Sequence, residues 1–273
     1  MAFSELLLFH GLGALSFFPT HLGSMGFVAA GLSLIALLLG LRLLPETWRP
    51  GTTAMRRRWL NWDGVRAALQ TPTVGPLILT FFLTIVGFSQ FEATLSLLNK
   101  DNLKLPNTQN FLMFAYVGLV LMLVQGLVYR RLAHRVREET FMSLGIVLMG
   151  LGVAGLGGAT WLALQPDHQS ELDHPDPAVL AAMLVCQAVA IAGFAFVNPS
   201  IQALISRRSD PSKQGAILGT NQSAGSMART LGPLMGLSLY GFEPSHLLPC
   251  AVGAAMIWLM LPLIPRIRRG AEV

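Results

Sequence analysis

Runs of about 20 consecutive apolar residues recur along this chain of 273 residues and constrain its fold more than any other feature. The hydrocarbon core of a bilayer is about 30 Å thick, and an α-helix of about 20 apolar residues crosses it. These runs predict an all-α integral membrane protein with about seven transmembrane helices. The predicted spans are residues 22–44, 76–98, 109–128, 141–164, 177–205, 215–241 and 246–265.

A shorter apolar run, residues 3–18, precedes the first predicted span. It is either the remnant of a further span or an interfacial helix. We do not interpret it as a signal peptide, because no Lys or Arg precedes Arg42 and the positively charged region of such a peptide is missing.

The composition excludes several other classes of protein. Hydrophobic residues make up 53% of the chain and charged residues 12%, whereas a soluble domain carries about 25% charged residues. Disorder, a coiled coil and an ordinary soluble enzyme are therefore excluded. Cys186 and Cys250 lie in apolar runs, and the six histidines lack metal-ligand spacing. We expect no disulfide framework, no metal site, no cofactor and no catalytic constellation of an enzyme.

The basic residues are concentrated in alternate loops. Fifteen of the 19 Lys and Arg residues lie in four segments that share one side of the predicted bundle. The loops on the opposite side hold only Lys100 and Lys104. Because positively charged loops stay in the cytoplasm, we expect these four segments to be cytoplasmic and a nucleic-acid partner to be excluded. The fifteen residues are Arg49, Arg56, Arg57, Arg58, Arg66, Arg130, Arg131, Arg135, Arg137, Arg207, Arg208, Lys213, Arg266, Arg268 and Arg269.

Four regions follow from this topology. Residues 1–44 hold a partial helix and one span, 45–75 form a basic cytoplasmic loop, 76–265 form a six-helix unit, and 266–273 are a cytoplasmic tail. In the long loop, the basic cluster 56–58 is followed by two tryptophans. This pattern is typical of an interfacial amphipathic segment, and a specific partner site is the alternative.

Two ionisable residues lie inside predicted spans, Glu92 and Arg229. Charged residues inside a membrane are rare and costly. At 1.5 Å per residue, Glu92 lies about 24 Å from Pro76 and Arg229 about 21 Å from Gly215. Matched depth predicts that the two attract each other, either as a structural ion pair or in a proton- or substrate-linked role.

Polar side chains also form stripes on three spans. A helical wheel groups Gln90 with Thr84, and Asn221 with Gln222. A third line contains Gln187, Phe194, Asn198 and Gln202. Amides on one face of a membrane helix either bond across helices or line a water-filled cavity. We include all these residues in a candidate pathway, with Phe194 as an apolar contact for a substrate.

Three stretches resemble the major facilitator superfamily in its drug-exporter branch. LLPET at 43–47 resembles the end of that family's sixth helix, and QGLVYRRLAHRVREE at 125–139 resembles its motif between the eighth and ninth helices. GTNQSAGSMARTLGPLMG at 219–236 follows its antiporter pattern, with Ala228 in place of one glycine. Tyr129 replaces the acidic residue that often precedes the first arginine of the second motif. The matching gating positions are Gly126, Arg130, Arg131, Arg135, Gly219, Gly232, Pro233 and Gly236.

The resemblance maps the seven spans onto helices six to twelve of a twelve-helix transporter, which is its C-terminal half. It implies proton-coupled efflux of a small organic molecule, of the multidrug or tetracycline-exporter kind, by alternating access between two halves. The expected partners are the lipid bilayer, a small-molecule substrate, protons, and a missing N-terminal half or a second copy. The expected location is the bacterial inner membrane, with the C-terminus in the cytoplasm. The alternative function is a truncated or half-size membrane protein that acts only with a partner half.

Overall fold

The computed structural model describes residues 21–45, 66, 71, 73–171, 174–211 and 213–269. The predictions for residues 3–18, for the cluster 56–58 and for the last residues of the tail lie outside this part of the chain. Two compact units divide the chain, Met1–Leu60 and Asn61–Val273. The first contains the helix α2 (His21–Leu43), which coincides with the first predicted span.

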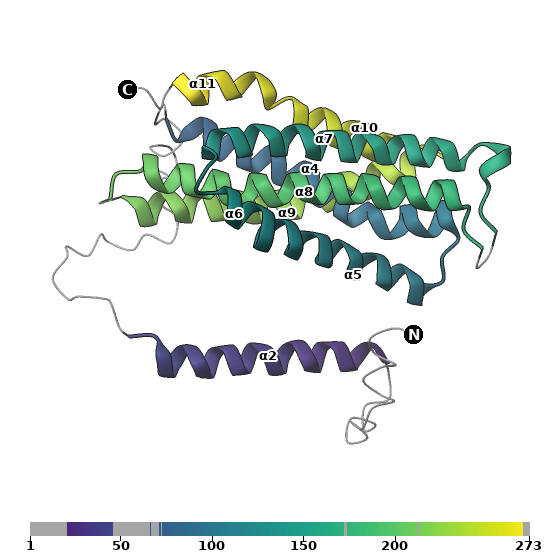
Figure 1. Cartoon of the computed structure of the whole chain (residues 1–273), viewed down its shortest axis with the longest axis horizontal. Helices are drawn as coiled ribbons and strands as arrows, with labels where there is room; N and C mark the ends of the chain where they lie inside the picture. Colours follow the sequence, from purple (N-terminus) through teal and green to yellow (C-terminus); the bar gives the residue numbers. More distant parts are fainter. Residues whose placement is uncertain are drawn as a thin grey trace. The chain divides into compact units, whose positions relative to one another are not determined.

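The second unit is a bundle of helices that run roughly parallel or antiparallel to one another (Figure 1). In chain order they are α4 (Gly75–Leu103), α5 (Asn107–Leu123), η2 (Val124–Tyr129), α6 (Arg130–Leu132), α7 (Glu138–Ala163), η3 (Pro166–His168), α8 (Pro177–Arg208), α9 (Gln214–Phe242), α10 (Leu248–Trp258), η4 (Leu261–Leu263) and α11 (Ile264–Arg269). Each predicted span thus contains at least one helix. The described part of the chain is all-α, as predicted.

Two predicted spans are less regular than the sequence suggests. The last five residues of the 109–128 span lie in η2, a π-helix, and the 246–265 span is divided into α10, η4 and α11. Pro262 lies in η4 and Pro265 in α11. Proline has no backbone N–H to donate, which accounts for the division of the second span.

Four helices in the described residues are long and apolar enough to cross a membrane. They are Gly75–Leu103, Gln109–Leu132, Glu138–Ala163 and Pro177–Arg208, and two shorter apolar helices cover Ala29–Leu43 and Leu248–Leu263. The helix α9 is long but carries more polar residues, among them Asn221, Gln222 and Arg229.

The core of the bundle lies where α7 packs against α8 and α4 packs against α9, with α10 over α7 and α4. A Cβ at Gly152 would lie 2.2 Å from the backbone nitrogen of Ala190, and one at Gly193 would lie 2.3 Å from that of Met149. The backbones of α7 and α8 therefore approach as closely as only glycine permits. By contrast, most side chains of α5 are exposed.

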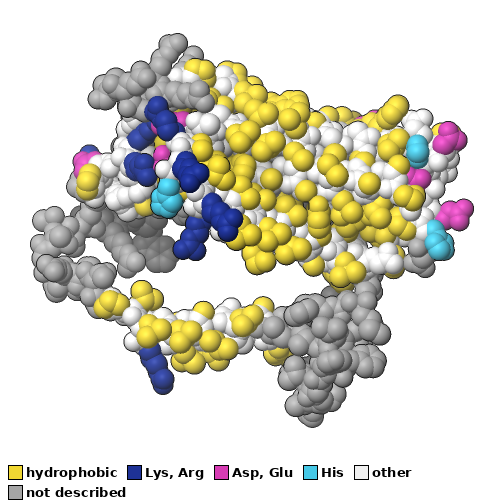
Figure 2. Space-filling model, in the orientation of Figure 1, with side chains coloured by type: hydrophobic (Ala, Val, Ile, Leu, Met, Phe, Trp, Pro, Cys, Tyr) yellow, Lys and Arg dark blue, Asp and Glu magenta, His cyan; other side chains and the backbone are white. Residues whose placement is uncertain are grey.

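The Lys and Arg side chains on the face of the bundle seen in Figure 2 are concentrated at one end. Lys and Arg gather at the end that holds the α6–α7 and α8–α9 connections, which we call the basic end. The opposite end shows acidic and histidine side chains, some of which also lie at the basic end, and hydrophobic side chains cover the surface between the two ends. This distribution suits a bundle whose middle lies in lipid.

Candidate functional site

The polar stripe of α4 points into the bundle. Thr84 and Gln90 are fully buried. The Gln90 Nε2 donates to the carbonyl oxygen of Pro249 at 2.6 Å, and the buried Thr84 hydroxyl has no hydrogen-bond partner among the described residues. The sequence predicts that both line a pathway, whereas the structure places them inside the helix packing.

The amide line on α8 is divided between two environments. Gln187 is buried and donates from Nε2 to Asn99 Oδ1 at 3.0 Å. Asn99 in turn donates to Asn110 Oδ1 at 3.3 Å, so amides connect α8, α4 and α5. Nearer the basic end, Asn198 and Gln202 are only partly buried and bond to each other at 3.2 Å. Gln187 thus bonds across helices, whereas Asn198 and Gln202 are accessible at the surface.

The polar stripe of α9 is also divided. Asn221 is fully buried, and in the part of the chain that the structure describes neither its Oδ1 nor its Nδ2 has a hydrogen-bond partner, whereas Gln222 is exposed.

The glycine pattern of α9 brings that helix close to α4. A Cβ at Gly232 would lie 2.6 Å from the Ser89 Cβ, and one at Gly236 would lie 2.8 Å from the Gln90 Cγ. Gly219, by contrast, has open space around it, and Pro233 is partly buried. Gly232 and Gly236 of the predicted motif therefore allow close packing between α4 and α9.

Glu92 and Arg229 are predicted to attract each other, but the structure sets them apart. Both side chains are exposed, and neither forms an ion pair with a described residue. The Arg229 side chain lies near Gly225 of its own helix, since a Cβ added at Gly225 would be 3.8 Å from the Arg229 Nη1. Gly225 in turn lies beside Phe81 of α4.

Phe81 and Glu92 are separated by about 16 Å along the axis of α4. The prediction of an ion pair assumed the wrong register between α4 and α9. It placed Pro76 level with Gly215, whereas the contacts place Phe81 level with Gly225.

An aromatic pair lies one turn from Glu92. The rings of Phe88 and Phe194 stack with centroids 3.8 Å apart and planes 10° apart, and Phe91 meets Phe88 edge-on at 5.7 Å. Both stacked rings are partly exposed. Phe88 and Glu92 are four residues apart on α4, so they share a helix face. The sequence analysis missed Phe88, although its spacing from Glu92 could have indicated it.

The basic motif after α5 lies largely at the surface. Gly126 is in the π-helix η2, and Arg130, Arg131 and Arg135 are exposed. Tyr129, at the position of the expected acidic residue, is partly buried: its ring lies 4.9 Å from that of Phe141, and its hydroxyl accepts from the Ser200 Oγ at 3.4 Å. Aromatic packing thus takes the place of a charge contact.

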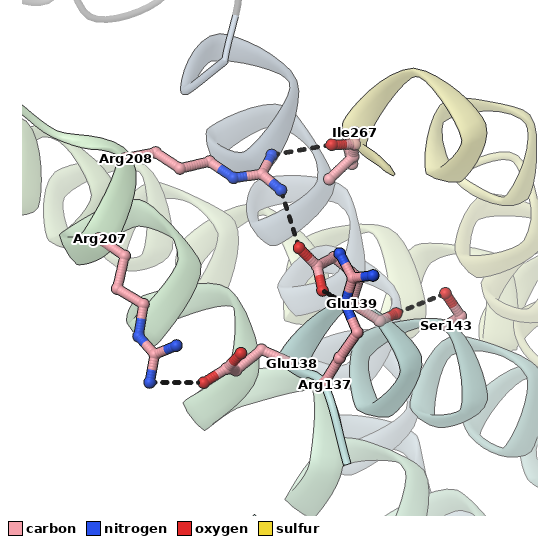
Figure 3. A network of polar contacts seen from close by, with 7 residues as sticks. All are labelled: Arg137, Glu138, Glu139, Ser143, Arg207, Arg208 and Ile267. Carbon is pink, nitrogen blue, oxygen red and sulfur yellow. Dashed lines mark hydrogen bonds and ion pairs between the residues drawn. The ribbon is translucent and has the colours of Figure 1, made fainter. Parts of the chain in front are cut away.

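A network of ion pairs joins three elements at the basic end (Figure 3). Arg208 of α8 donates from Nη2 to Glu139 Oε1 of α7 at 3.1 Å and from Nη1 to the carbonyl oxygen of Ile267 in α11 at 2.9 Å. The Arg208 and Glu139 side chains are only 10% and 9% exposed. A more exposed pair, Arg207 with Glu138, lies beside them at 2.8 Å.

The opposite end carries a smaller polar cluster. The Tyr240 hydroxyl of α9 donates to Asp101 of α4, and the rings of Tyr240 and His246 stack at 4.0 Å. Asp176 accepts from the Ala178 and Val179 amides at 2.9 Å and so caps α8. These hydrogen bonds, that from Val179 first, hold the pKa of the Asp176 carboxyl below its ordinary value.

The amino-acid sequence of the chain is similar, at modest identity, to those of several known proteins. No family model matches the chain. It is 26% identical to mouse "Major facilitator superfamily domain-containing protein 10" over 71% of the chain and 38% of that protein. It is 28% identical to the Escherichia coli "Tetracycline resistance protein, class C" over 95% of the chain and 60% of that protein. The chain is related to the major facilitator superfamily. A rat "Solute carrier family 22 member 18" is 24% identical over 78% of the chain and 48% of that protein.

The chain spans less than two thirds of the length of each of these superfamily relatives. Together with the four membrane-length helices, the similarity supports an integral membrane protein. None of the relatives' names denotes an enzyme.

The network of ion pairs at the basic end was not predicted from the sequence. Its signal was present, because the acidic pair Glu138 and Glu139 and the basic pair Arg207 and Arg208 lie at helix ends on the same side of the predicted topology. Within the described residues, no three His, Cys, Asp or Glu side chains could hold a metal ion together.

Proposed function

We propose that the chain is one half of a proton-coupled exporter of small organic molecules that works by alternating access. The observation that carries this proposal is the exposure of Glu92 in the middle of the membrane-length helix α4. A carboxylate at that depth is too costly to face lipid. It therefore faces a water-filled path, where it can bind and release a proton.

A second half completes the path in this proposal. The helix α5 is apolar and mostly exposed, and α9 exposes polar side chains that include Gln222 and Arg229. These surfaces suit another bundle of the same kind, either an N-terminal half or a second copy. In this arrangement α2 is the last helix of the other half, 45–75 is the connection between the halves, and 76–265 is the C-terminal half.

The proposed orientation rests on charge, and the proposed direction of transport rests on one of the relatives. In this proposal the basic end and the C-terminus lie in the cytoplasm, and the membrane is a bacterial inner membrane. The "Tetracycline resistance protein, class C" supports efflux and suggests tetracycline as the first compound to test. The alternative function is a truncated or half-size membrane protein that does not transport alone, so that a second copy of the chain does not complete the path and only a different partner half does.

Reconstitution tests this function. The chain, alone and co-expressed with an N-terminal half from a relative, is placed in liposomes under an imposed pH gradient. We expect tetracycline flux that stops when the gradient is dissipated. The variant Glu92→Gln should abolish this flux without loss of helix content. Flux that persists without a gradient would exclude proton coupling. Flux only in the co-expressed sample would favour the alternative.

A further inference from the structure

A histidine with an unusual backbone conformation lies at the end of the bundle opposite the basic end. His246 belongs to the connection between α9 and α10, and its φ is 55°. Such a conformation is costly and persists where surrounding contacts hold it. Here Tyr240 of α9 and Asp101 of α4 supply those contacts. We propose that these three side chains form a pH-sensitive clasp, which tightens when His246 is protonated and fixes the α9–α10 connection to the end of α4.

The hydrogen bond of the His246 ring shows which nitrogen can change its protonation. The Nδ1 atom lies 2.8 Å from the backbone carbonyl oxygen of Tyr240. A carbonyl oxygen only accepts hydrogen bonds, so Nδ1 carries a hydrogen and donates it. The proton that the imidazole gains or loses is therefore the one on Nε2. The Nδ1 bond is present in both protonation states, and it orients the ring.

The other nitrogen faces a carboxylate. The His246 Nε2 lies 4.0 Å from the Asp101 Oδ2, and the two side chains are 29% and 44% exposed, so protons from solution reach the imidazole. This distance is too long for a hydrogen bond but permits attraction between opposite charges. The Asp101 carboxylate is held in place because it accepts from the Tyr240 hydroxyl. A neutral imidazole gains little from this carboxylate, whereas an imidazolium forms an ion pair with it.

The ring stack also favours the charged form of the histidine. The rings of Tyr240 and His246 lie 4.0 Å apart with planes 4° apart. The face of an aromatic ring is electronegative and attracts a cation. Protonation thus strengthens two contacts and removes none. Because the folded state favours the protonated form, the clasp stabilises the protein at low pH, and this contribution is lost as the pH rises through the range in which histidine titrates.

Other charged or titratable groups on the neighbouring elements have no comparable contact with the imidazole. Among the described residues, only Asp101 forms an ion pair with His246. The lysines near the end of α4 are exposed, where water and salt screen their charges. The remaining groups on α4, in the connection and on α10 are Lys100, Lys104, Glu243 and Cys250. The charge of Asp101 therefore dominates the response of the clasp to pH.

The clasp connects solution pH to the helix that carries Glu92. Asp101 follows Glu92 by nine residues on α4, which is about 13 Å along the helix axis. In the proposed orientation this end of the bundle faces away from the cytoplasm, so the acidic side of the proton gradient would tighten the clasp. Only this consequence rests on the proposed function, since the clasp itself requires no transport.

Hydrogen exchange measured by mass spectrometry tests the clasp on the purified full chain in detergent. Exchange of the amides in residues 240–251 is followed at pH 5.5 and at pH 8, on either side of the histidine range. Each variant is compared with the wild-type chain at the same pH, so the intrinsic effect of pH on exchange cancels. Asn adopts a positive φ readily, so His246→Asn preserves the backbone. Asp101→Asn removes the charge and keeps an acceptor for Tyr240.

The expected result is a loss of protection at low pH only. At pH 5.5, His246→Asn should speed exchange about fivefold and Asp101→Asn about threefold, whereas at pH 8 each should change it less than about twofold. The double variant should match His246→Asn alone at pH 5.5, because the ion pair is already lost in that variant. Matched controls are His134→Asn and Asp167→Asn, which change an exposed histidine and an exposed carboxylate elsewhere and should leave this exchange unchanged.

The outcomes separate the clasp from the transport function. Size-exclusion profiles and helix content verify that each variant is folded. Equal effects of His246→Asn at the two pH values would overturn the clasp, as would single effects that add in the double variant. If pH-driven flux is absent but exchange follows the expected pattern, the clasp stands and the transport proposal fails. If flux is present but His246→Asn alters exchange equally at both pH values, the transport proposal stands and the clasp fails.

Discussion

At the scale of single residues, neighbouring arginines at the end of α8 differ in their surroundings. Arg208 is nearly buried and contacts both Glu139 and the Ile267 carbonyl, whereas the Arg207 side chain is 70% exposed. Breaking a buried ion pair leaves an uncompensated charge and costs several kcal/mol, whereas an exposed pair contributes less than about 1 kcal/mol. Burial, more than the distance between the charges, sets their contribution.

We therefore predict that Arg208→Gln lowers the free energy of unfolding by about 3 kcal/mol, whereas Arg207→Gln lowers it by less than about 1 kcal/mol. Unfolding in mixed micelles measures both. Combining Glu139→Gln with Arg208→Gln should recover part of the loss, since no lone charge remains. Equal effects of the two single arginine changes would contradict the assigned burial.

A second prediction at this scale concerns Glu92 and Arg229. Because the structure separates them, the double variant Glu92→Gln with Arg229→Gln should show the sum of the two single effects, within about 0.5 kcal/mol. A double-mutant cycle on the free energy of unfolding measures this sum. A double variant more stable than either single variant would show that the residues meet in another state of the protein.

At the scale of elements, local chemistry determines where α8 begins. Asp176 caps α8 and Pro177 occupies the first turn, where proline lacks only a donor that would be unpaired. The cap depends on the charge of Asp176, because a carboxylate accepts hydrogen bonds from amides better than a carboxylic acid does. Stability from this cap is therefore pH-dependent.

The sign follows from the lowered pKa of Asp176. A carboxyl whose pKa is lower in the folded state stabilises the protein above its ordinary value of 3.8, and this contribution is lost as pH falls below that value. Asp176→Ala should thus lower the melting temperature at pH 7 and have a smaller effect at pH 3. Asp176→Asn retains a capping acceptor, so its melting temperature at pH 7 should lie between those of the wild-type chain and Asp176→Ala. A difference that stays constant with pH would contradict this cause.

At the scale of the whole molecule, the separation of charges between the two ends predicts the orientation in the membrane. His134 is exposed at the basic end and Gln169 is exposed at the opposite end. Positive residues are retained in the cytoplasm, so the two positions should lie on different sides of the bilayer.

Cysteine labelling in intact cells tests this orientation. In a background with Cys186 and Cys250 replaced by serine, Gln169→Cys should react with an impermeant maleimide. His134→Cys should react only after the membrane is permeabilised. Reaction of His134→Cys in intact cells would reverse the assigned sides, and the network of Arg208 would then lie outside.

The sequence by itself determined the all-α class, the places of the seven helical segments and the order of basic and acidic connections. These properties depend on local apolar length and on charges near helix ends, which a linear pattern records. Only the tertiary structure decided which face of each helix is buried. It turned Gln90 and Gln187 inward, aligned Phe81 with Gly225, and brought Phe88 onto Phe194. Register and facing arise from contacts between distant helices, such as the close approach at Gly232 and Gly236, and a pattern within one helix does not contain them.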